Sequence, residues 1–109
     1  MSEVAEVLQT IDRLHAALAD LMVRGLRSAG QAQLGPLEAL REELERIGAA
    51  HLAGRITALL DCVRGDSREA APALLRAQTS LRLFERILTL QQAEGLLQGL
   101  MPEDEDEAR

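Results

Sequence analysis

Apolar residues recur every three or four positions along most of the chain, which is the spacing that places them on one face of an α-helix. The first such stretch predicts a long amphipathic helix over residues 3–27, with Ser2 as its N-cap. Its apolar positions are Val4, Val7, Leu8, Ile11, Leu14, Leu18, Leu21, Met22 and Leu26. Glu6, Arg13 and Asp20 lie on the opposite face, so this helix is expected to bury one side and expose the other.

Two shorter helices are predicted in the middle of the chain. Proline is common at the first position of a helix, so Pro36 predicts a second helix over residues 36–47, after a connection over residues 28–35. A third helix is predicted over residues 49–64, because the apolar positions after Gly48 lie roughly 120° around the helix axis from those before it. Glycine also commonly ends helices. A single kinked helix through Gly48 is the alternative.

A fourth helix is predicted over residues 66–92. Asp66 and Glu69 have the spacing of a capping box, and Pro72 predicts a bend or a separate first turn. Residues 93–102 contain two glycines and predict only a weak, broken extension of this helix. Together the helices predict an all-α fold, a small four-helix antiparallel bundle in the order long, short, short, long.

Chain length and charge indicate one folded domain followed by a tail. The 109 residues suit a single helical bundle domain over residues 1–101. Residues 102–109 are predicted to form a disordered acidic tail, because they offer nothing apolar to bury. Most of the net charge of −6 lies in the five consecutive acids of residues 103–107. This tail either keeps the protein soluble or binds a basic partner.

Composition argues against several classes of function. Leu and Ala dominate, Phe84 is the only aromatic residue, and every basic residue is Arg, as is typical of GC-rich bacterial genomes. A nearly neutral body with an acidic tail and few stacking rings is a poor match for nucleic acid. No apolar stretch is long enough to span a membrane, and the single cysteine, Cys62, cannot form an internal disulfide. The N-terminus is unlike a signal peptide, so we expect a cytoplasmic protein without membrane contact.

The sequence contains no catalytic, cofactor-binding or metal-binding constellation. His15 lies within the apolar face of the first helix and is predicted to be a buried histidine that is hydrogen-bonded across the bundle. The other nitrogen or sulfur ligands are His51 and Cys62, and no Glu-x-x-His or His-x-x-x-His spacing occurs. Cys62 is predicted to be half-buried, and no motif pairs it with a base. We therefore expect no enzyme activity, no cofactor and no metal.

The predicted fourth helix has two apolar faces. One is the expected core face, formed by Ala70, Leu74, Ala77, Leu81, Phe84 and Leu88. The other lies mostly opposite and comprises Leu83, Ile87, Leu90 and Leu97. An apolar patch of this size in water usually signals association. The second face therefore predicts a dimer or partner interface, unless this helix is central and covered on all sides.

Arg82 and Arg86 lie beside this second face. They either flank the interface and select acidic groups, or form a solvated rim. We expect a non-enzymatic helical protein–protein interaction module, such as an adaptor, assembly factor or small regulator, that forms a homodimer or binds a protein partner. A helical DNA-associated regulator is the first alternative, and a metal- or ligand-binding bundle is the second. No stretch is specific enough to indicate a family.

Overall fold

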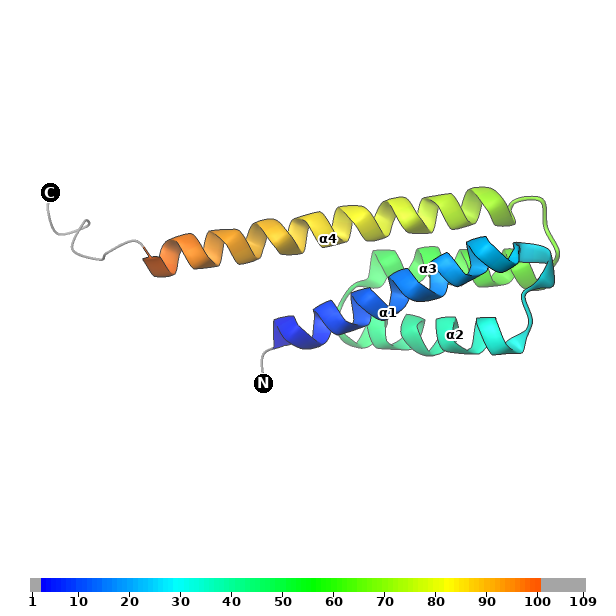
Figure 1. Cartoon of the computed structure of the whole chain (residues 1–109), viewed down its shortest axis with the longest axis horizontal. Helices are drawn as coiled ribbons and strands as arrows, with labels where there is room; N and C mark the ends of the chain where they lie inside the picture. Colours follow the sequence, from blue (N-terminus) through cyan, green and yellow to red (C-terminus); the bar gives the residue numbers. More distant parts are fainter. Residues whose placement is uncertain (1–2, 101–109) are drawn as a thin grey trace, which may run out of the picture.

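The computed structural model describes residues 3–100, without the side chains of residues 3 and 4, and Figure 1 shows its helices. The elements are α1 (Glu3–Arg24), the 3-10 turn η1 (Leu26–Ser28), α2 (Gln31–Arg46), α3 (Ala50–Arg64) and α4 (Ala70–Leu100). The all-α class is thereby confirmed, and residues 3–100 contain no strand. The predicted tail at 102–109 lies outside the described residues.

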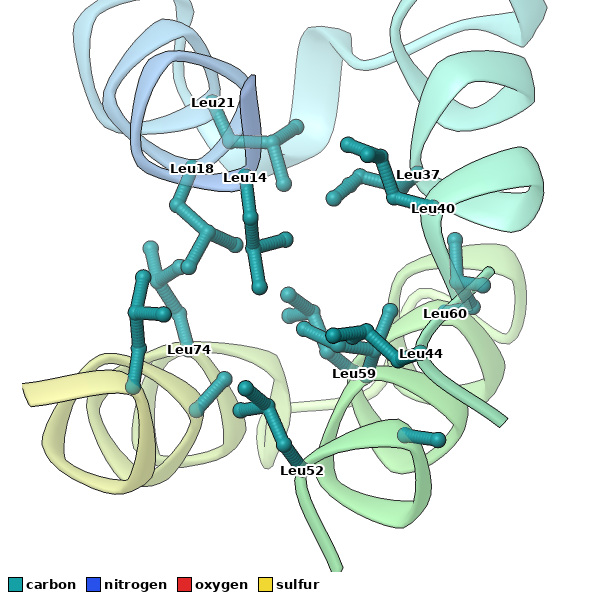
Figure 2. Packing of buried hydrophobic residues seen from close by; sticks show 14 of the residues in the cluster. Leu14, Leu18, Leu21, Leu37, Leu40, Leu44, Leu52, Leu59, Leu60 and Leu74 are labelled. Atoms are coloured by element: carbon teal, nitrogen blue, oxygen red, sulfur yellow. The ribbon is translucent and has the colours of Figure 1, made fainter. Parts of the chain in front are cut away.

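The four helices enclose a core made mostly of leucine, with some alanine and isoleucine. In Figure 1 the chain turns back at each connection, and in Figure 2 the helices surround the buried side chains. α4 packs mainly against α3 and more lightly against α1, and α2 lies between α1 and α3. The largest fully buried side chains are Ile11, Leu14, Leu18, Leu21, Leu37, Leu44, Ile56, Leu59 and Leu81. Met22, predicted on the apolar face of α1, is instead 56% exposed.

The second helix begins earlier than predicted. α2 starts at Gln31, directly after Gly30, whose backbone N–H donates to the Gln33 side chain at 2.8 Å. This bond satisfies one of the amides that a helix start leaves unpaired. Leu34, predicted in a connection, is buried in the core, and Pro36 lies inside the helix. The prediction was wrong because the burial of Leu34 favours an additional helical turn before the proline.

The break between α2 and α3 is confirmed. Gly48 adopts a left-handed conformation with φ of +89°, which glycine reaches without a steric penalty. The backbone N–H of Ala49 donates to the Leu44 carbonyl at 2.8 Å, and that of Gly48 donates to the Glu45 carbonyl at 3.2 Å. These two bonds form a Schellman motif, which satisfies carbonyls at the end of α2. The chain can then turn sharply into α3.

The fourth helix begins later than predicted. Asp66 does not cap it, because Asp66 has a φ of +52° and belongs to the turn that ends α3. In that turn the backbone N–H of Ser67 donates to the Cys62 carbonyl at 2.9 Å. The Ser67 hydroxyl in turn accepts from the Glu69 backbone N–H at 3.0 Å. Because α4 begins at Ala70, Pro72 lies in its first turn, where a missing N–H does no harm.

The fourth helix also continues further than predicted. It is a single helix of 31 residues that passes through both of its glycines and ends at Leu100. Its core side chains end at Leu88, and every residue from 89 to 100 is exposed. Figure 1 shows this segment, which we call the overhang, extending beyond the other three helices. The residues before it, 70–88, form the packed half of α4.

α1 and α2 are joined at their polar edge by Glu43. The buried Thr10 hydroxyl donates to its carboxylate at 2.7 Å, and Arg13 and Arg46 donate at 3.1 and 3.3 Å. The hydrogen bond from Thr10 lowers the pKa of Glu43 most, and the two arginine charges lower it further, against the opposing effect of partial burial. The carboxylate therefore stabilises the α1–α2 contact while it is ionised.

We predict that Glu43→Gln lowers the free energy of unfolding at pH 7 by about 1 kcal/mol, because the neutral amide loses the charge-assisted bonds. The pKa of Glu43 is lower in the folded than in the unfolded chain. The contribution of ionised Glu43 to the free energy of unfolding is therefore complete above about pH 4.5, the ordinary pKa of a glutamate. It is lost as the pH falls through the lowered pKa of Glu43 in the folded chain. Chemical denaturation between pH 3 and 7 tests this. Glu42→Gln, at a neighbouring exposed side chain, is the control and should change little.

We also predict that the same glycine-to-alanine change has opposite effects at two positions. Gly48→Ala should destabilise the protein by about 1 kcal/mol, because alanine is strained at a positive φ. Gly54→Ala should stabilise it by about 0.5–1 kcal/mol, because Gly54 is inside α3 with open space around its Cα. Thermal unfolding of both variants tests the Schellman motif, and equal shifts of the same sign would contradict it.

Candidate interaction surface

The second apolar face predicted on the fourth helix is exposed. Leu83, Ile87, Leu90 and Leu97 have exposed fractions of 58%, 53%, 62% and 60%. We call these four residues the α4 stripe. The opposite face is the core face, on which Ala70, Leu74, Ala77 and Leu81 are buried and Phe84 and Leu88 are half-buried. Within one chain α4 is therefore covered on one side only, and the alternative of a central helix buried all round is contradicted.

The stripe has the spacing of a coiled-coil seam. Its first three members are separated by four and three residues, and the next two positions in that alternation are Glu94 and Leu97. Alternate spacing of three and four residues keeps side chains facing a partner helix along its length. Glu94 places one carboxylate in an otherwise apolar seam. The surface is therefore shaped to lie along another helix.

The overhang carries two further leucines that the sequence-based prediction missed. Leu96 and Leu100 are 69% and 78% exposed and lie outside the stripe. They were missed because neither lies on the face to which the prediction assigned Leu97. The spacing of four residues between them was the available signal.

An apolar groove lies beside the part of the stripe on the packed half. Its volume is about 350 Å³. On one side it is lined by the connection between α2 and α3 and the start of α3, residues 48–52, and on the other by Ser80, Leu83, Phe84 and Ile87. The groove could not be predicted from sequence, because the turn at Gly48 brings these segments together. Two members of the stripe thus form the wall of an apolar recess.

Arg82 and Arg86 are both exposed, as a flanking position requires. Arg82 lies toward α1, in a small pocket that includes His15 and Gln78. Among residues 3–100, neither arginine takes part in an ion pair. Both charges therefore lack a carboxylate partner within the described part of the chain.

His15 is not the buried histidine that the sequence predicted. Its side chain is 44% exposed, and its Nε2 atom lies 2.9 Å from the Glu85 carboxylate of α4. The hydrogen bond across the bundle is therefore present but at the surface, where such pairs contribute little. The prediction was wrong because His15 lies at the margin of the apolar face of α1, next to the exposed Ala16.

The other residues considered for catalysis or metal binding do not gather into a site among the described residues. Cys62 is half-buried, at a shallow pocket that also includes Asp66, Ser67 and Arg68. Across residues 3–100, no three side chains of His, Cys, Asp or Glu gather in a way that could hold a metal ion. In the same part of the chain, no helix combines the length and apolarity needed to cross a membrane.

Comparisons with protein-family models, with curated proteins and with solved structures found no match to this chain. The α4 stripe and the groove beside it therefore carry the functional argument.

Proposed function

We propose that this protein is a non-enzymatic interaction module, a four-helix antiparallel bundle that associates with itself through the α4 stripe. The observation that carries the proposal is the position of the stripe. Four large apolar side chains, each more than half exposed, lie along a helix that extends past the bundle that holds it. A cytoplasmic location fits the single, half-buried Cys62, since a lone thiol needs no oxidising compartment.

The energy of burial favours association. Each fully buried Leu or Ile side chain stabilises a complex by about 1.5–3 kcal/mol relative to its exposed form. Four such side chains on one helix supply enough to oppose the entropy lost when two proteins associate. The spacing along the stripe lets all four contact one partner helix at the same time.

The overhang also favours association. Isolated helices of 12–15 residues or fewer are marginal in water, and each glycine in a helix costs about 1 kcal/mol relative to alanine. The overhang is of this length and contains Gly95 and Gly99. Continuity with the packed half removes the cost of starting the helix, but no other helix within residues 3–100 covers residues 89–100. A partner lying along the stripe stabilises this segment.

We predict that the double variant Leu83→Glu/Ile87→Glu raises the dissociation constant of the wild-type dimer by about 100-fold or more, because two apolar contacts become buried charges. Its helical circular dichroism and unfolding temperature should be close to those of the wild-type monomer, because both side chains are already exposed. Sedimentation velocity over a concentration series measures the dissociation constant.

The matched control is Leu75→Glu. Leu75 is 59% exposed on the same helix but lies off the stripe. This variant should dimerise like the wild type. A wild-type chain that remains monomeric at millimolar concentration contradicts the proposal, as does a Leu75→Glu variant weakened as much as the stripe variant.

A further inference from the structure

We infer that the stripe pairs with the stripe of a second copy in the antiparallel orientation, with the two-fold axis near Leu90. This inference rests on the proposed function and adds the identity and direction of the partner helix. Three features of α4 carry it: the distribution of charge along its exposed side, the spacing of the stripe about Leu90, and the position of the groove.

The exposed charges of α4 are separated along its length. Arg76, Arg82 and Arg86 are exposed on the packed half, whereas Glu94, also exposed, lies in the overhang. Glu85 is the only other acid of α4, and His15 already contacts it. The arginine-bearing half of one helix is thus complementary to the overhang of another only when the second helix is reversed.

A parallel pair would juxtapose like charges. Equivalent seam positions face each other in a parallel coiled coil, so Glu94 would meet the partner's Glu94 between apolar layers. Two carboxylates in such a site disfavour each other's ionised form. In the antiparallel pair, Glu94 lies level with the partner's Arg86 instead. Each dimer then contains two such oppositely charged contacts.

The spacing of the stripe fits this reversal. Leu83 and Leu97 each lie seven residues from Leu90, about 10 Å along the helix axis on either side. With the two-fold axis at Leu90, each Leu97 lies level with the partner's Leu83, and the two Leu90 side chains meet. Apolar side chains therefore oppose apolar side chains at three levels.

The position of the groove favours the same direction. It is bounded by residues 80–87 of α4 and is open to solvent beside Leu83 and Ile87. In the antiparallel pair, residues 93–100 of the partner overhang lie level with the groove, and the partner's Leu97 lies against Leu83 at its wall. In a parallel pair the two overhangs face each other, beyond both grooves.

Substitution of Glu94 distinguishes the two directions by the sign of its effect. In the antiparallel dimer, Glu94→Gln should raise the dissociation constant about tenfold at low salt, because two opposite-charge contacts are lost. Added salt should weaken the wild-type dimer and affect this variant less. In a parallel dimer the same substitution removes a repulsion and tightens association, and this result would overturn the inference.

A charge exchange tests the assigned contact. Arg86→Glu and Glu94→Arg should each weaken the dimer, and the double variant R86E/E94R should recover most of the wild-type affinity. Arg27→Glu, a change of equal net charge at an exposed arginine of η1, is the matched control and should have no effect. A double variant weaker than both single variants overturns the contact.

A distance measurement reports the direction itself. With nitroxide labels at Gln98→Cys in a Cys62→Ala background, the antiparallel dimer places the labelled positions about 24 Å apart along the helix axis. A parallel dimer places them roughly 10 Å apart, the separation of neighbouring helices. A short distance between the labels overturns the antiparallel direction. If the variant Leu83→Glu/Ile87→Glu also disrupts that dimer, the proposed function stands. A chain that remains monomeric contradicts both.

Discussion

α4 packs against α3 and α1 through side chains that end at Leu88, although the helix itself continues to Leu100. The constraint is one of length. At 1.5 Å per residue, α4 is about 46 Å long, whereas α3 is about 23 Å and α1 about 33 Å. A helix this long cannot bury its whole core-facing side against such neighbours. The overhang follows from this mismatch, whereas the stripe is exposed because the other helices cover α4 on one side only.

The other three helices determine which part of α4 extends beyond its neighbours. The Schellman motif at Gly48 ends α2 and directs α3 back along the core, so that the connection between them lies beside the middle of α4. Glu43 joins α2 to α1 through Thr10 and Arg13, and Arg46 also contacts its carboxylate. Because the shorter helices end near this connection, α4 continues alone. The apolar side chains on this segment are therefore exposed.

Helical periodicity was sufficient to predict the all-α class, the break at Gly48 and both faces of α4. These features depend on residues close together along the chain, where the 3.6-residue repeat decides which face is apolar. The sequence was less informative where distant contacts decide. Leu34 is helical because its side chain is buried in the core. The groove exists because a turn brings residues 48–52 beside Leu83. Glycine illustrates the difference: Gly48 ends a helix, whereas α4 passes through Gly95 with the same residue type. Local propensity does not distinguish these two positions.

The central claim is that the overhang is stabilised by a second chain. Backbone amide hydrogen exchange across residues 90–100, measured at several protein concentrations, tests this claim most directly, because exchange reports local opening residue by residue. If a second chain stabilises the overhang, exchange in this segment is slow when the protein is concentrated, and the protection falls on dilution in step with the fraction of dimer. Protection in the packed half, residues 70–88, should change little. Exchange in the overhang that is equally fast at every concentration would contradict the account.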